Sequence, residues 1–143
     1  MIKKLDRSTI KVAAIILFAT IFFSWTGQGY AANKTQFDIL YMNHGPMRPT
    51  IAKIKELLGN YQNTVQASWH DVDQASGKSF MKQQKINGHI PMLIMIDGQS
   101  DFSIDGRAVK LQGFPTGASP FKRVEGNWSL EDLQLLLDEK TRE

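Results

Sequence analysis

The sequence contains no cysteine among its 143 residues. This absence excludes disulfides, thiolate metal sites, iron–sulfur clusters and a cysteine nucleophile. With 42% apolar and 22% charged residues, the composition is otherwise that of an ordinary folded protein, and no internal repeat is present. We therefore expect one domain of ordinary size that folds without covalent cross-links.

The part expected to fold also lacks an excess of positive charge. The net charge of +3 arises within residues 1–32, where four basic side chains accompany one acidic side chain, while residues 33–143 hold 13 of each sign. Nucleic-acid binding depends mainly on clustered lysine and arginine side chains that displace phosphate counterions. The balanced charge of residues 33–143 argues against a nucleic-acid partner.

Residues 1–32 have the three-part pattern of a secretory signal peptide. A short basic segment precedes an uncharged apolar run over 12–25, and small residues suited to signal peptidase follow. The run has 14 residues, whereas a membrane-spanning helix needs about 20, so we expect cleavage after Ala31 or Ala32, with an uncleaved anchor as the alternative. The short start with its lysine pair is typical of bacteria. Residues 33–143 are then periplasmic or secreted, and contact the membrane only if the signal segment stays attached.

Hydrophobic periodicity in residues 33–143 predicts an α/β domain. Strands are expected over 37–43, 64–69, 91–96, 101–104 and 107–112, and helices over 47–58, 79–85 and from Ser129 onward. Asp105-Gly106 is a two-residue hairpin signal because both residues tolerate positive φ. Ser129 is a suitable N-cap for the last helix, which carries a leucine stripe.

The order of these elements is β-α-β-α-β-β-α. A strand, a crossover helix and a second strand imply a parallel pair, and the later hairpin adds antiparallel strands. We expect a mixed sheet of four to five strands with flanking helices. The first strand is apolar at nearly every position, which predicts a strand covered on both faces.

Two short motifs within this order resemble those of the thioredoxin-like superfamily. The segment 44–47, His-Gly-Pro-Met, stands between the first strand and the first helix, where a thioredoxin has Cys-Gly-Pro-Cys. The segment 88–93, Gly-His-Ile-Pro-Met-Leu, is similar to the cis-proline loop of the family, and the hairpin ending at Gly113 is similar to the family's last hairpin. The resemblance covers most of residues 37–138. It implies a thioredoxin-like fold with a cis Ile90–Pro91 peptide bond.

The redox activity of that family does not carry over to these positions. Both cysteines are replaced, by His44 and Met47, and thiol–disulfide exchange requires a thiolate. His44 is the one plausible base at the loop, and neither a Ser-His-Asp pattern nor a Gly-rich phosphate loop accompanies it. We therefore expect a redox-inactive protein that is not an enzyme and needs no cofactor.

The resemblance still implies a surface for a partner around the two loops. A protein or an extended peptide could bind there by strand addition along the proline loop. The residues of this expected site are His44, Gly45, Pro46, Met47, His89, Ile90 and Pro91. The alternative, in which a cis proline is only an architectural feature, stays open.

A periplasmic copper site is the alternative function. The two motifs would bring imidazole and thioether groups to one end of the sheet, and this ligand set suits Cu(I). The groups belong to His44, Met47, His89 and Met92. Against this hypothesis, both methionines occupy positions where apolar packing is expected. A weaker zinc alternative uses His70 with Asp71 and Asp73.

Overall fold

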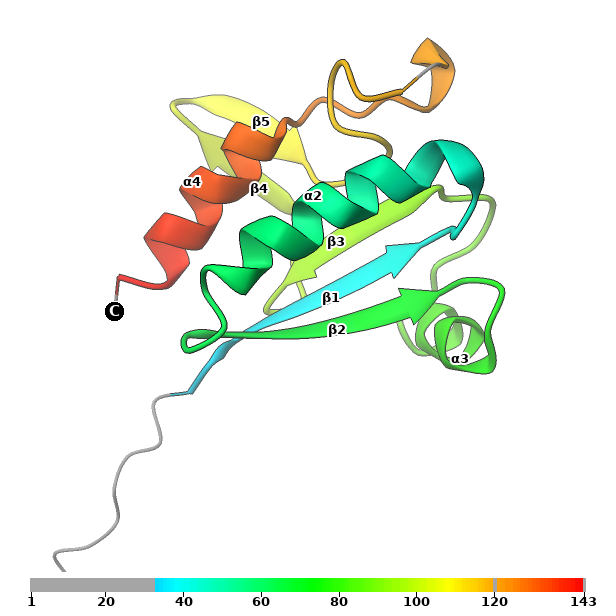
Figure 1. The fold of residues 1–143 in the computed structure, drawn as a ribbon, viewed down its shortest axis with the longest axis horizontal. Coiled ribbons are helices and arrows are strands. Elements are labelled where there is room, and N and C mark those ends of the chain that lie inside the picture. Colours follow the sequence, from blue (N-terminus) through cyan, green and yellow to red (C-terminus); the bar gives the residue numbers. More distant parts are fainter. Residues whose placement is uncertain (1–32, 120, 143) are drawn as a thin grey trace, which may run out of the picture. The chain divides into compact units, whose positions relative to one another are not determined.

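The computed structural model describes residues 33–119 and 121–142 (Figure 1). The expected signal segment, residues 1–32, lies outside the described residues. In chain order the elements are β1 (Thr35–Tyr41), the 3₁₀ turn η2 (Gly45–Met47), α2 (Arg48–Gly59), β2 (Val65–Asp71), α3 (Ala75–Gln83), β3 (Met92–Ile96), β4 (Asp101–Ile104), β5 (Arg107–Lys110), the 3₁₀ turn η3 (Lys122–Val124) and α4 (Leu130–Lys140). The predicted order of strands and helices is confirmed.

Three strands form a mixed sheet in the order β2-β1-β3. The central strand β1 is parallel to β2 and antiparallel to β3, so that Ile39 lies between Trp69 and Ile94. The helix α2 makes the crossover between the two parallel strands, as the sequence predicts. The chain is thus an α/β protein with a mixed sheet.

The strands β4 and β5 form a separate two-stranded sheet, which corrects the expectation of one sheet with four to five strands. The turn between them has positive φ at Asp105 and Gly106, 50° and 78°, as predicted. The segment 111–113, which follows β5, lies antiparallel beside β3. The Ile94 N–H donates to the Leu111 carbonyl and the Gly113 N–H to the Met92 carbonyl, each at 2.9 Å.

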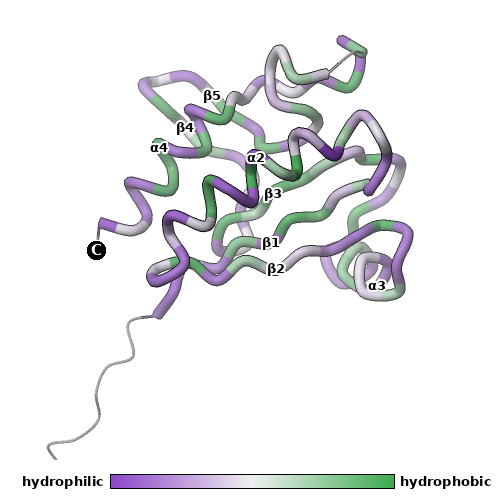
Figure 2. The backbone as a smooth tube through the Cα atoms, in the orientation of Figure 1, coloured by the Kyte–Doolittle hydropathy of each residue, from purple (hydrophilic) through white to green (hydrophobic). Residues whose placement is uncertain are grey.

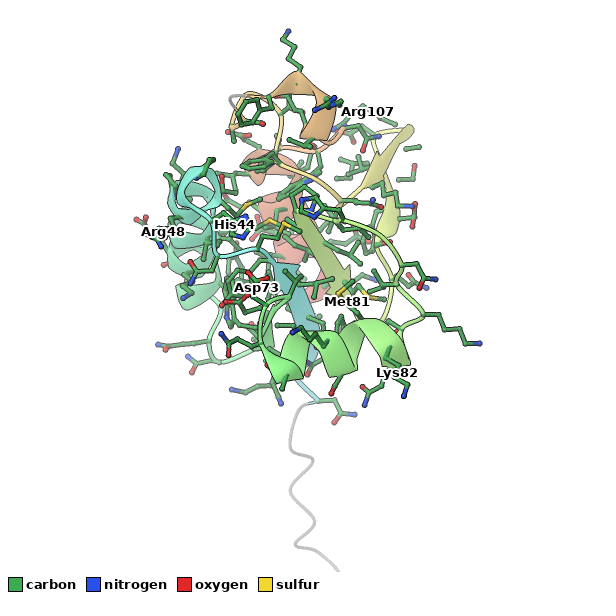
Figure 3. All side chains as sticks on the ribbon, turned by 90° about the vertical axis from the view of Figure 1, so that its right-hand side faces the viewer. His44, Arg48, Asp73, Met81, Lys82 and Arg107 are labelled. Carbon is green, nitrogen blue, oxygen red and sulfur yellow. The ribbon has the colours of Figure 1, made fainter. Side chains whose placement is uncertain are left out.

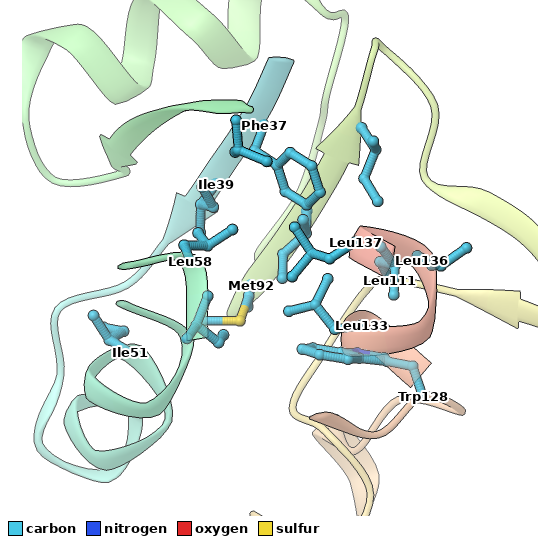
Figure 4. Close-up of a cluster of buried hydrophobic side chains, with 14 of the residues drawn as sticks. Phe37, Ile39, Ile51, Leu58, Met92, Leu111, Trp128, Leu133, Leu136 and Leu137 are labelled. Atoms are coloured by element: carbon cyan, nitrogen blue, oxygen red, sulfur yellow. The ribbon is translucent and has the colours of Figure 1, made fainter. Parts of the chain in front are cut away.

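The main core lies on the face of the sheet that α2 and α4 cover (Figure 4). Alternate strand residues point into this core, because successive side chains of a strand project to opposite faces. Its fully buried members include Phe37, Ile39, Ile54, Met92, Ile94, Leu111, Trp128, Leu133 and Leu137. The helix α4 begins with a capping box, in which the Ser129 hydroxyl accepts from the Asp132 N–H and the Asp132 carboxylate accepts from the Ser129 N–H. The predicted N-cap is confirmed.

The opposite face of the sheet is covered only in part, by the short helix α3. Leu40, Phe80 and Leu93 form a second, smaller cluster beneath this helix. The rest of this face holds polar side chains, and the Gln36 amide donates to Ser68 Oγ at 3.0 Å. Figure 2 shows that β3 is apolar along its length and that the outer strand β2 is more polar. The first strand is thus covered on both faces at Ile39 and Leu40, as expected, but its start is covered only in part.

Within the described residues, none of the helices is long and apolar enough to cross a membrane.

Candidate functional site

The two loops singled out by the sequence lie at the same end of the three-stranded sheet. The pairing of Tyr41 with Met92 joins the end of β1 to the start of β3. One residue further on, the Met42 N–H donates to the Pro91 carbonyl at 3.0 Å. The loop that follows β1 and carries His44 is therefore held beside the loop that precedes β3. Figure 3 looks onto this end of the sheet.

The Ile90–Pro91 peptide bond is trans, as is every other peptide bond that the structure describes. The expectation of a cis bond is wrong. The chain reversal between α3 and β3 takes place earlier, at Lys85 and Gly88, which both have positive φ. Pro91 directly precedes β3, and its carbonyl accepts a hydrogen bond from the N–H of Met42, the residue after β1.

His44 and the two residues after it are exposed at the start of the turn η2. The His44 backbone is extended, its carbonyl accepts from the Met47 N–H at 3.0 Å, and its side chain caps no backbone group. The His44 Nε2 lies 3.4 Å from the Asp73 Oδ2, and both side chains are more than half exposed. An ion pair with this exposure contributes little to stability. His44 is thus available to a partner.

The other residues expected in the site are divided between surface and core. Met47 is 2% exposed and Met92 is fully buried, and both thioethers belong to the main core. Ile90 packs against the small cluster beneath α3. The imidazole of His89 is exposed. No contact in the described part of the chain brings the four groups of the copper hypothesis together, and the packing of both methionines agrees with a structural role.

His89 and Pro91 line a hollow of about 480 Å³ at this end of the sheet. Its other walls come from the segment 110–113, which follows the hairpin, and from the segment 123–127. No local sequence pattern indicates that 123–127 belongs to the site, because the two walls come together only through contacts distant in sequence.

The segment 124–126 closes the edge of the sheet beside 112–114. The Phe114 N–H donates to the Val124 carbonyl at 2.9 Å, and the Gly126 N–H donates to the Phe114 carbonyl at 2.7 Å. Glycine is required here, because a Cβ on Gly126 would lie 2.1 Å from the Gln112 carbonyl oxygen. Since these hydrogen bonds occupy this edge, a peptide cannot add to it as a further strand without displacing 124–126.

A polar network fixes the wall 123–127 against the hairpin. The Asn127 side-chain amide accepts from the Lys110 N–H at 2.9 Å and donates to the Ala108 carbonyl at 3.0 Å. The Arg107 guanidinium donates to the Asn127 carbonyl at 2.9 Å and to the buried Asp132 carboxylate at 2.5 Å. These bonds hold the two walls of the hollow at a set separation.

His70, which lies outside the expected site, is closer to a carboxylate than His44 is. The His70 Nε2 lies 2.9 Å from the Asp38 Oδ1, and the imidazole stacks on Phe80 with ring centres 3.9 Å apart. His70 and Asp71 are neighbours on a strand and point to opposite faces, which removes the basis of the zinc hypothesis. Among the described residues, no three His, Asp or Glu side chains form a group that could hold a metal ion.

Comparisons with protein-family models, with curated proteins and with solved structures find no match to this chain.

The chemical groups at this end of the sheet can be described one by one. The chain has no cysteine, and the His44 ring is paired only with an exposed carboxylate. At the end of β1, burial and the nearby Asp71 carboxylate raise the pKa of Tyr41, so its hydroxyl stays protonated and cannot act as a base at neutral pH. The groups at this end of the sheet are exposed imidazoles, cationic side chains and a shaped hollow.

Proposed function

We propose that the protein is an exported, redox-inactive member of the thioredoxin-like superfamily that binds another protein at the end of the sheet formed by the His44 and Pro91 loops. The observation that carries the proposal is the hydrogen bond from the Met42 N–H to the Pro91 carbonyl, which holds the two loops side by side. An exposed imidazole stands on each loop, and the hollow beside Pro91 has room for several partner side chains.

The family assignment is supported by topology as well as by the two motifs. A parallel pair joined by a helix is followed by an antiparallel strand, a hairpin and a last helix, in the strand order β2-β1-β3 with 111–113 beside β3. The loop with His44 in the place of a cysteine lies at the carboxyl end of β1, directly before a helix. Fold alone says nothing about activity, so the function rests on the site.

The manner of binding differs from strand addition along a cis-proline loop. The Ile90–Pro91 bond is trans, the Pro91 carbonyl is already bonded to Met42, and the segment 124–126 covers the nearby sheet edge. We therefore propose that side chains of the partner enter the hollow, while its backbone lies across the exposed His44 turn. An extended segment of a protein fits this arrangement, because it can present successive side chains without a fold of its own.

Site-specific photo-crosslinking tests this proposal. A photoreactive amino acid replaces His89 at the rim of the hollow, and a matched variant carries it at Glu139, which is exposed near the end of α4, the helix that leads to the opposite end of the domain in Figure 1. After irradiation in living bacteria, the His89 variant should yield a discrete crosslinked protein that the Glu139 variant does not. Equal yields from both positions, or none from either, would refute the proposed site.

Export is tested separately by the mass of the protein recovered from the periplasm. We expect a chain that begins at Ala32 or Asn33, because small residues stand before these positions and the apolar run is shorter than a membrane span. An intact N-terminus in the membrane fraction would show that the segment is kept as an anchor.

A further inference from the structure

The rim of the hollow beside Pro91 carries an excess of positive charge. The residues His89, Lys110 and Arg123 line it, and all three are exposed. Glu125 is the one carboxylate in its lining, and its Oε1 accepts a hydrogen bond from the Gly117 backbone N–H. The lining is thus basic in a domain whose residues 33–143 are neutral in sum.

The positive groups of the rim are not neutralised by close partners within the part of the chain that the structure describes. The nearest carboxylate to Lys110 is that of Asp101, whose Oδ1 lies 3.9 Å from the ammonium, and both side chains are more than half exposed. Arg123 and His89 have no ion-pair partner among residues 33–119 and 121–142. An ion pair as long and as exposed as that of Lys110 with Asp101 is weak, so the Lys110 ammonium is free to bind a ligand instead.

The backbone that carries these groups is fixed before any ligand binds. The Lys110 N–H is bonded to the Asn127 side chain, and Arg123 precedes Val124, whose carbonyl accepts from Phe114. The Trp128 indole N–H closes the same region by donating to the Gln112 carbonyl at 3.2 Å. Walls that are already ordered lose little conformational entropy on binding, which favours a specific ligand.

We propose that this hollow selects acidic segments of the partner, with aspartate and glutamate carboxylates seated between Lys110 and Arg123. The inference rests on the proposed function and adds the chemical class that the site recognises. Charge complementarity carries it: the rim is cationic, its single carboxylate already accepts a backbone hydrogen bond, and the Gln112 amide and Gly113 backbone add polar groups to the lining. A volume of about 480 Å³ exceeds the needs of one carboxylate and suits two or more side chains of an extended segment.

Fluorescence anisotropy with the exported protein, purified from the periplasm, tests the inference. The probe is a fluorescein-labelled peptide of sequence Gly-Asp-Glu-Asp-Glu-Gly, and its control is the uncharged Gly-Asn-Gln-Asn-Gln-Gly. We expect the acidic probe to bind and the amide probe not to bind, and we expect the affinity to fall as salt screens the charges. Equal binding of the two probes, or no binding of the acidic probe, would overturn the inference.

Variants separate this hollow from a general attraction to positive charge. Lys110→Gln and Arg123→Gln should each weaken binding of the acidic probe about fivefold, as expected for an exposed charge pair, and the double variant about 25-fold. The matched control is Lys122→Gln, because Lys122 is exposed on the same turn η3 and does not line the hollow. It should change the affinity less than twofold, roughly the smallest effect measured for exposed pairs. An effect of Lys122→Gln as large as that of Arg123→Gln would overturn the inference.

Two further arms distinguish the possible errors. Inorganic phosphate should displace the acidic peptide only through its effect on ionic strength, as sodium chloride does. Displacement at far lower concentration would make the hollow a small-anion site and overturn the inference. If position 89 crosslinks a discrete partner while the acidic probe fails to bind, the proposed function stands and the selectivity for acidic segments is refuted.

Discussion

Replacing Gly126 with alanine tests the architecture of the hollow, because this glycine lies where two segments distant in sequence meet. A Cβ at this position would lie 2.1 Å from the Gln112 carbonyl oxygen and 2.7 Å from the Trp128 Cδ1. Real Cβ atoms essentially never come so close to another heavy atom, and one of the two neighbours is backbone. The segment 124–126 must therefore move away from 112–114.

The cost follows from the hydrogen bonds that such a movement breaks. The Gly126 N–H would lose the Phe114 carbonyl, now at 2.7 Å, and the Trp128 indole N–H would lose the Gln112 carbonyl, now at 3.2 Å. A buried polar group left without a partner costs about 1–3 kcal/mol, so two of them cost about 2–6 kcal/mol. This is a large share of the roughly 5–15 kcal/mol by which a domain is usually stable.

Urea unfolding followed by tryptophan fluorescence measures the change, since Trp128 is fully buried in the core that would be disturbed. The matched control is Gly59→Ala at the end of α2, where an added Cβ meets nothing within 4 Å. Alanine favours a helix over glycine by up to about 1 kcal/mol, so this control should be neutral or stabilising. If Gly126→Ala lowers the free energy of unfolding by less than about 0.5 kcal/mol, the described pairing of 124–126 with 112–114 is refuted.

Three other predictions concern the loop at His44 and the helix packing. Met47→Leu should cost under about 1.5 kcal/mol of stability, because the substitution conserves volume in the core. Calorimetry with Cu(I) under reducing conditions should find no tight one-to-one binding to the unmodified protein. Tight binding that is lost in His44→Ala would instead support the copper site. The double variant His44→Cys with Met47→Cys should gain some insulin reductase activity, because the start of a helix favours the thiolate. The unmodified protein should show none. If the variant folds but its two thiols cannot form a disulfide, the alignment of this loop with thioredoxins is refuted. The Tyr61 hydroxyl donates to the Asp138 carboxylate at 2.5 Å, and this bond, with burial, raises the pKa of Tyr61. The hydrogen bond contributes about 0.5–1.5 kcal/mol to stability below pH about 10, and this contribution is lost as the pH rises through the folded-state pKa of Tyr61. Tyr61→Phe should therefore destabilise the protein at neutral pH and reduce the stability that it loses at alkaline pH. Equal urea midpoints for the variant and the unmodified protein, at neutral as well as at alkaline pH, would argue against this role.

Features encoded over a few neighbouring residues could be predicted from the sequence. The Asp105-Gly106 turn follows from the tolerance of these residues for positive φ, and the start of α4 follows from the capping box at Ser129. The start of α3 could not be predicted in this way, since the helix begins at Ala75 rather than at residue 79. Its first turn contains Gly77, a poor helix former that lies against the Asp71 carbonyl, where a Cβ would come within 1.9 Å. Tertiary packing, which no local pattern reveals, decides this turn.

The candidate site was predictable only in the part that its two loops contribute. Alternation and turn signals placed the His44 loop after the first strand and Pro91 at the start of the third. The resemblance implied that the two loops lie together, and the Met42 to Pro91 hydrogen bond shows them side by side. The cis proline came from the resemblance alone and is wrong. No local sequence pattern predicts the wall around Arg123. Its position depends on the close approach of Gly126 to the Gln112 carbonyl and on the hydrogen bond between Asn127 and Lys110 of β5.

The central claim is that a partner binds at the end of the sheet between the His44 and Pro91 loops, and amide chemical-shift mapping tests it most directly. The partner captured by crosslinking is titrated into isotope-labelled protein, and the shifts are followed residue by residue. The account predicts changes concentrated at residues 44–47, 89–92 and 110–113 and at 123–127. Changes confined to α3, to the outer strand β2 or to the exposed side of α4, with these four segments unaffected, would contradict it.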